Sequence, residues 1–366
     1  MKIIRNLRKS LVKEFGHVRV CNYLESIINN SNPETPIVQE YFIMLEKPRL
    51  SAFYPPEHQL MHALLAEKLD SSLYSLYPKE LISYQKGKTL GDVFRDLKIF
   101  LSEYKKSCPN KSKRVLGVVK WDIKSYGESI PLHEASKLWN QLETAKLGEL
   151  IPWLKSELRA VVHNPQSNDG PMSLIRGLTF GMPTTSPLNN LYLADFDRDL
   201  CRRFPDVFYR RFGDDCLLVT KDIGELQEIN QWVIQELATY ELRQNPNKSI
   251  YFPWTMSGFE SASRIEFLGR SVNFNGRMHL TKKKQKALID HWKGLMIKVK
   301  RTDESYLIPT WDAFVKSPIC EELYLWGNDS DSVKNLSDRL FQLTKKNFDL
   351  KKEKNYQCLF KKWHHK

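Results

Sequence analysis

The stretch VFYRRFGDDCLLVTKD, residues 207–222, decides the fold of this chain. Apolar residues lie on both sides of Gly213 and Asp214, a pattern that predicts two short strands joined by a tight turn. Glycine and aspartate favour polar turns, so an ordinary hairpin turn is the first interpretation. The apolar flanks favour another, because a buried hairpin that presents two consecutive acids must offset their repulsion. Metal ions do so well, and a metal site is therefore the competing hypothesis.

Another acid stands near the end of a second predicted strand. The stretch RVLGVVKWDI (114–123) is β-branched and apolar, as a buried strand is, and it carries Asp122. Two neighbouring strands can bring Asp122 close to Asp214 and Asp215 if each places its acids at the same edge of a sheet. Phosphoryl transfer by two magnesium ions needs such hard oxygen ligands, with the metals roughly 3.5–4 Å apart. The arrangement therefore indicates a two-metal site.

The remaining pattern predicts alternating helices and strands. Two more strands are expected, SIYFPW (249–254) and RIEFLGRSVNF (264–274), and the chain after Leu280 has the pattern of basic helices. Helices are expected over residues 1–45, 57–70, 89–104, 133–163 with a break at Pro152, 185–204 and 223–242.

These motifs, taken in order, resemble those of the reverse transcriptase family over about residues 47–275. The set is specific, although each motif alone is weak. KWDIKSYGESI (120–130) is similar to the first catalytic motif, and FYRRFGDD (208–215) to the Tyr-x-Asp-Asp motif, with Phe212 in the aromatic place. The other matches are YQKGKT (84–89) with the basic fingers segment, GLTFGMPTTSPLNNLYLADFD (177–197) with the loop and helix under the template and nucleotide, NPNKS (245–249) with a lysine turn, and EFLGRSV (266–272) with a primer-grip hairpin.

The resemblance implies an α+β fold, a right-hand polymerase with fingers, a palm built on an antiparallel sheet with flanking helices, and a helical thumb. We expect fingers over residues 1–115 and a palm over 116–275, with an inserted helical fingers segment around 133–175. A basic helical thumb and tail are expected over 276–366.

The resemblance also implies the roles of the acids. Asp122 and Asp214 are the expected metal ligands, helped by the backbone carbonyl of Ile123, while Asp215 supports the metal less directly. All three acids are expected to be catalytic. The implied cofactor is a pair of Mg²⁺ ions, for which Mn²⁺ can substitute.

Basic residues are candidates to neutralise a triphosphate, which needs several cations around it. Lys86 and Lys88, with Lys47 or Arg49, are the candidates, and a solvated basic loop is the alternative for each. The GKT in this segment is not a Walker loop, because Ile82 stands where that loop has glycine.

Further candidates for the nucleotide pocket lie between and after the acids. Lys248 either approaches the triphosphate or acts as a general acid for pyrophosphate, and a structural place in its turn is the alternative. Gly181 and Pro183 are expected to shape the loop under the base pair, although a helix-entry turn explains them too. Phe180 stands nearest to the place where many relatives carry a glutamine.

One position departs from the family pattern in a way that concerns substrate choice. Reverse transcriptases usually carry an aromatic residue five places after the first aspartate, where it blocks a ribose 2′-hydroxyl. Gly127 occupies this place here, and Tyr126 precedes it. Either Tyr126 is the gate, or the enzyme discriminates poorly against ribonucleotides.

Charge and composition agree with a nucleic-acid partner. The net charge is +13, and residues 281–366 hold 19 Lys+Arg against 11 Asp+Glu, so +8 of it lies there. The lysines around 282–300 are expected to contact phosphate, and the tail mixes aromatics with lysines, as RNA-binding segments do. A solvated charged face, or a helix on a membrane surface, is the alternative. Six scattered cysteines, no signal peptide and no membrane-spanning run suggest a cytoplasmic protein.

The expected function is RNA-templated DNA synthesis from deoxynucleotides on a nucleic-acid primer. The expected setting is a bacterial stand-alone enzyme of the retron or phage-defence kind, with a structured non-coding RNA as a candidate template and no membrane partner. Two alternatives stay open: an RNA-dependent RNA polymerase, which the sequence GDD and Gly127 favour, and an RNA-binding scaffold without activity.

Overall fold

The computed structural model describes residues 40–44, 47–51, 56–158, 161–162, 172–173, 177–178, 182–255, 264–290, 293 and 342. The chain divides into two compact units, residues 1–88 with 119–252 and residues 89–118 with 253–366. The expected division into fingers, palm and thumb stays a prediction. The central sheet has the strand order β6-β7-β3-β8. Its strands are β6 (Phe208–Phe212), β7 (Asp215–Thr220), β3 (Val115–Asp122) and β8 (Ile250–Thr255).

The hairpin of β6 and β7 has the predicted form. The strands are antiparallel, and Phe212 pairs with Asp215, so Gly213 and Asp214 form the two-residue turn. Gly213 has φ +64, a left-handed backbone conformation that glycine adopts without steric penalty. Strand β3 lies beside β7 and is buried along most of its length, which explains its nearly continuous apolar sequence.

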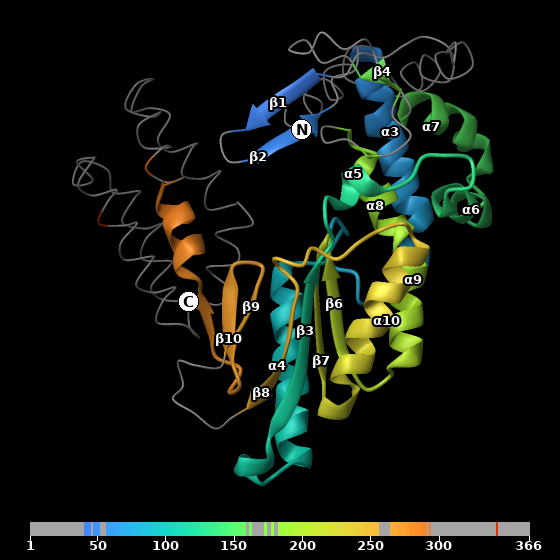
Figure 1. The fold of residues 1–366 in the computed structure, drawn as a ribbon. Helices are drawn as coiled ribbons and strands as arrows, with labels where there is room; N and C mark the ends of the chain where they lie inside the picture. The colour runs from blue at the N-terminus through green and yellow to red at the C-terminus, as the bar shows by residue number, and fades with distance from the viewer. Residues whose placement is uncertain are drawn as a thin grey trace. The chain divides into compact units, whose positions relative to one another are not determined.

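Helices pack around this hairpin within the first unit. Helices α9 (Ala194–Arg203) and α10 (Leu226–Thr239) run alongside β6 and β7 (Figure 1). One hydrophobic core contains Trp121 from β3, Leu218 from β7 and Phe196 from α9. The core also receives α3 (Pro56–Leu73), α5 (Tyr126–Ser129), α6 (Lys137–Thr144), α7 (Ile151–Leu158) and α8 (Thr185–Tyr192). The short hairpins are β1 (Glu40–Met44) with β2 (Lys47–Ser51), and β4 (Val161–Val162) with β5 (Met172–Ser173).

The second unit has a core of its own. Helix α4 (Leu90–Ser107) begins at the capping box of Thr89 and Asp92, as the sequence predicted. Aromatic rings fill the core: Phe94 lies 6.5 Å from Phe267, and Phe274 lies 4.8 Å from Trp254, between ring centroids. The small sheet of this unit has the order β11-β10-β9, from β9 (Arg264–Phe267), β10 (Arg270–Asn273) and β11 (Met278–Leu280), and residues 282–290 are helical.

Several expectations about elements were wrong in detail. Residues 264–274 form a hairpin, as the family resemblance implied, and not the single strand that their pattern predicted, because Leu268 and Gly269 both have positive φ. Pro152 lies in the first turn of α7, where proline is tolerated, and the helical break comes earlier, at 145–150. The expected helix over 185–204 is two helices that meet at Leu193. Residues 40–44 form a strand, whereas residues 1–39 lie outside the described part.

Candidate active site

The end of β3 and the turn of the β6–β7 hairpin meet at one edge of the central sheet. The amide of Ile123 donates a hydrogen bond of 3.0 Å to the carbonyl of Asp214. This bond connects the residue after Asp122 to the first acid of the turn. The backbone therefore brings together the two segments that carry the predicted catalytic acids.

Asp122 is buried and held by the turn that follows α10. Its Oδ1 accepts a 3.0 Å hydrogen bond from Nδ2 of Asn245, and its Oδ2 forms an ion pair with the Nζ of Lys248. The backbone amide of Asn245 also donates to the carbonyl of Asp122, at 2.8 Å. The hydrogen bond from Lys248 to Asp122 raises the pKa of the lysine above its ordinary value. The structure thus places Lys248 at the predicted catalytic acid.

Burial and the two other acids make the carboxyl of Asp215 harder to ionise. Burial, followed by the negative charges of Asp214 and Asp122, raises the pKa of its carboxyl to about 6. Lys120 and Lys248 oppose this shift only in part. Three carboxyl groups therefore share one electrostatic environment, and ionising all of them is unfavourable.

This donor set suits a divalent cation. Carboxylate oxygens are the ligands that Mg²⁺ prefers, and a cation would relieve the repulsion that raises the pKa of Asp215. Among the described residues, no group of three His, Cys, Asp or Glu side chains lies close enough together to hold an ion as it stands. The carboxylate of Asp122 is directed to Lys248 and Asn245. The metal and catalytic roles of Asp122, Ile123, Asp214 and Asp215 stay predictions.

A buried polar network supports the turn, and sequence patterns gave no sign of it. The amide of Gly213 donates to Oγ of Ser83 at 3.0 Å, and this hydroxyl donates to Oδ1 of Asn190 at 3.0 Å. Arg211, fully buried, forms an ion pair of 2.7 Å with Asp197 of α9. Its Nη2 also donates to the carbonyl of Asn190 at 3.1 Å.

The expected triphosphate ligands differ in how the structure places them. Lys86 is exposed, next to Gly87 with φ +83. Lys88 instead donates to the carbonyl of Leu81 at 2.7 Å, a contact that holds its own turn together. The side chains of Lys47 and Arg49 lie outside the described part of the chain, and so do residues 179–181, including Phe180 and Gly181.

Tyr126 lies in the hydrophobic core and not at a surface. Its ring is 5% exposed, and its hydroxyl donates to the carbonyl of Asn189. A Cβ at Gly127 would come within 3.1 Å of the carbonyl of Leu178, whose amide already donates to the carbonyl of Gly127 at 2.7 Å. Close backbone packing therefore accounts for the glycine, and a role of Tyr126 as the gate stays a prediction.

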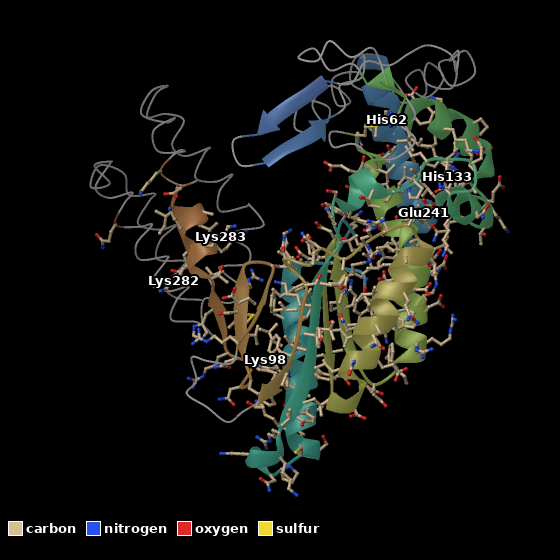
Figure 2. All side chains as sticks on the ribbon, in the orientation of Figure 1. His62, Lys98, His133, Glu241, Lys282 and Lys283 are labelled. Atoms are coloured by element: carbon tan, nitrogen blue, oxygen red, sulfur yellow. The ribbon has the colours of Figure 1, made fainter. Side chains whose placement is uncertain are left out.

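A second buried cluster, distinct from the carboxylates, joins three helices of the same unit. His62 of α3 (labelled in Figure 2) bonds to Oγ1 of Thr184 at 3.0 Å and to Oε2 of Glu157 at 3.3 Å. The ring of Trp153 lies 5.0 Å from that of His62. All polar atoms of the imidazole are satisfied within the core, so this cluster serves packing.

Comparison with known proteins concerns the fold and the family of the chain. No curated protein sequence matches the chain. Solved structures of telomerase share its fold: that from Candida albicans with a fragment of telomeric RNA (13% identity, TM-score 0.52, covering 92% of this chain and 66% of that one). Telomerase from Candida tropicalis matches in its truncated apo form, at 12% identity and a TM-score of 0.52, covering 71% of this chain and 60% of that one. Its complex with a fragment of telomeric RNA matches at 14% identity and a TM-score of 0.55, covering 95% of this chain and 61% of that one.

The chain thus spans about 60% of the length of these telomerase chains. At such low identity the likeness concerns the fold alone. The family assignment comes from the sequence profile of the reverse transcriptases (RNA-dependent DNA polymerases), which matches residues 45–272. This match covers more than half of the chain, so the chain belongs to the reverse transcriptase (RNA-dependent DNA polymerase) family.

Proposed function

We propose that this protein is an RNA-directed DNA polymerase that extends a primer 3′-hydroxyl with deoxynucleotides. The observation that carries the proposal is the meeting of the Asp122 strand end with the Asp214–Asp215 turn, joined by the Ile123–Asp214 hydrogen bond. The raised pKa of Asp215 supports it, because the charges of Asp214 and Asp122 add to the effect of burial on this carboxyl. Such clusters are where two-metal chemistry is found.

The acids and their neighbours take distinct roles in this proposal. Asp122, Asp214 and the carbonyl of Ile123 hold two Mg²⁺ ions, or Mn²⁺ in their place, and Asp215 supports them from the next position. When bound, the ions activate the attacking hydroxyl and stabilise the leaving pyrophosphate. Lys248, whose side chain is half exposed, could turn from Asp122 towards the triphosphate. Lys86, with Arg49 from β2, adds positive charge for the same phosphates.

The residues that follow Asp122 bear on the choice between deoxyribose and ribose. The buried Tyr126 and the closely packed Gly127 support weak discrimination against ribonucleotides. This observation also favours the second candidate function, an RNA-dependent RNA polymerase. Phe180 and Gly181 keep their proposed place under the base pair.

We further propose a cytoplasmic, bacterial enzyme of the retron or phage-defence kind, with a structured non-coding RNA as template and a role in defence against phage. This part rests on the motif set alone. No helix within the described residues is both long and apolar enough to cross a membrane. Protection of cells against phage, lost in an Asp214→Ala strain, is the outcome that the defence role requires.

Primer extension on an RNA template tests the activity. Magnesium with deoxynucleotides is compared with magnesium and ribonucleotides, for the wild type, Asp122→Ala, Asp214→Ala and the control Asp199→Ala. Asp199 is a half-exposed acid of α9 that pairs with Arg202. We expect deoxynucleotide incorporation that falls at least about 1,000-fold in the first two variants and is unchanged in the control.

Each other outcome has a definite meaning. Preferred incorporation of ribonucleotides identifies an RNA polymerase. Activity retained in Asp214→Ala contradicts the assigned site. A wild type that binds primer and template but incorporates neither kind of nucleotide supports the scaffold.

A further inference from the structure

The segment before the basic YQKGKT stretch is fixed to the catalytic hairpin. The amide of Ile82 donates to the carbonyl of Arg211 at 2.9 Å, and the amide of Arg211 donates to the carbonyl of Glu80 at 3.1 Å. Ser83 then accepts the bond from Gly213 at the turn itself. Because these bonds fix Ile82 and Ser83, the next residue, Tyr84, has a defined position beside the turn that carries the predicted metal ligands.

Tyr84 has an unusual backbone and an unusual exposure. Its φ is +53, in the left-handed region that bulky residues rarely adopt, and the residue is 59% exposed. Two contacts to the carbonyl of Leu81 hold this turn: Nε2 of Gln85 and Nζ of Lys88, each at 2.7 Å. A strained conformation that its surroundings enforce is a feature of functional sites, where the geometry serves a ligand.

The ring of Tyr84 lies next to an aromatic residue of the catalytic hairpin. Its centroid is 6.1 Å from that of Phe212, with 38° between the planes. Phe212 is only partly buried and directly precedes Gly213 and Asp214. Two partly exposed rings thus stand together at the acids, with the exposed Lys86 two residues further along. Rings next to a cation are the combination that receives a nucleotide, base on ring and phosphate on lysine.

We propose that Tyr84 and Phe212 form an aromatic platform that stacks a nucleobase beside the catalytic acids. The proposal rests on the proposed function, since a polymerase site holds nucleobases at that point. Two bases have this chemistry: that of the incoming nucleotide and that of the primer 3′ end. The experiment has one arm for each.

The variants separate the ring from the backbone and from the hydroxyl. Tyr84→Phe keeps the ring, whereas Tyr84→Asn removes it and tolerates the left-handed backbone. Tyr74→Asn is the matched control, because Tyr74 is 53% exposed on the 3₁₀ turn Tyr74–Leu76 of the same unit. The first arm measures the Kd of a primer–RNA duplex in EDTA, with 2-aminopurine at the primer 3′ end as a fluorescent report of stacking. The second measures KM for deoxynucleotides with magnesium.

We expect Tyr84→Asn to raise either the Kd of the primer–RNA duplex or the KM for deoxynucleotides by about 5- to 150-fold. This is the range for one base stacked on an aromatic ring. The arm that changes identifies the base. Tyr84→Phe and Tyr74→Asn stay within twofold of the wild type. Thermal unfolding verifies that Tyr84→Asn is folded, and Tyr84→Leu replaces it otherwise.

The platform is wrong if loss of the ring leaves both constants within twofold, or if Tyr84→Phe loses as much as Tyr84→Asn. The EDTA arm needs no turnover, so it separates this proposal from the activity. If the wild type quenches 2-aminopurine through Tyr84 but synthesises no DNA, the platform is supported and the proposed polymerase activity is contradicted. A wild type that does neither overturns both.

Discussion

At the scale of single residues, ionisation of the Asp215 carboxyl is unfavourable in the folded protein. The pKa of Asp215 rises from 3.8 to about 6 because of burial and of the charges of Asp214 and Asp122. The folded protein therefore keeps a proton on this carboxyl over a range in which the unfolded chain has lost it. Folding stability falls as the pH rises from about 4 to about 6, and the loss persists at pH 7.

We predict that Asp215→Asn stabilises the metal-free protein at pH 7 by roughly 1–3 kcal/mol, because asparagine cannot ionise and one pKa unit corresponds to about 1.4 kcal/mol. The gain should shrink as the pH falls from about 6 and vanish below 3.8, where the wild-type carboxyl is neutral in both the folded and the unfolded chain. Urea unfolding in EDTA across this pH range measures the difference, with the half-exposed Asp199→Asn as control. A variant that is less stable than the wild type at pH 7 would refute this account of the charges.

Residues of the site differ in how visible they were to sequence analysis. The turn at Gly213 and Asp214 was predicted correctly, because its signal is local: a glycine and an acid between apolar runs. Ser83, Asn190 and Asn245 were missed. Ser83 lies 130 positions from Gly213 and 107 from Asn190, and Asn245 lies 123 from Asp122. A serine or asparagine has no periodic pattern, so only the folded chain reveals such partners.

At the scale of elements, a buried ion pair joins strand β6 to helix α9. Arg211 and Asp197 are both fully buried, and the hydroxyl of Tyr209 donates to the same carboxylate at 2.6 Å. Such a pair stabilises little compared with apolar side chains, but removing one partner leaves an uncompensated charge in the core. Here the arginine also precedes the turn of the predicted catalytic acids by two residues, so the pair fixes the base of the hairpin.

We predict that Arg211→Met destabilises the fold by about 3–5 kcal/mol, and that adding Asp197→Leu recovers most of this loss. Unfolding in urea of both single variants and the double variant forms a double-mutant cycle. The exposed pair of Arg203 and Glu228 is the comparison, where Arg203→Met should change stability by less than about 1 kcal/mol. If the double variant is as unstable as the two single losses added together, the pair does not act as a unit.

Some boundaries of helices and strands have a clear local signal in the sequence, and others do not. Helix α4 was predicted to start at Thr89, and the structure shows a local capping box of Thr89 and Asp92 at that end. The hairpin at Leu268 and Gly269 was less visible in the pattern, since a glycine inside an apolar run fits a strand as well as a turn. Pro152 was misread because proline starts a helix as readily as it breaks one.

At the scale of the whole molecule, positive charge is concentrated towards the end of the chain. Of the net +13, residues 281–366 carry +8, from 19 basic and 11 acidic residues. The helical residues 282–290 expose Lys282 and Lys283 (Figure 2), while Leu288 and Ile289 are buried.

The charge predicts how binding responds to salt. Lysines that neutralise phosphates release counterions, so the logarithm of the affinity for a primer–RNA duplex should fall linearly with the logarithm of the salt concentration. With about four phosphates neutralised, the slope is roughly −3 to −4, a loss of about 100-fold between 50 and 200 mM salt.

Replacing Lys282 and Lys283 with glutamine should make the slope less steep by about 1 to 2. Lys137→Gln is the control, because its ammonium already bonds to Thr239 and lies over the ring of Tyr240. A slope near zero would mean that charge does not drive binding, and an unchanged slope in the double variant would place the contacts on other basic residues.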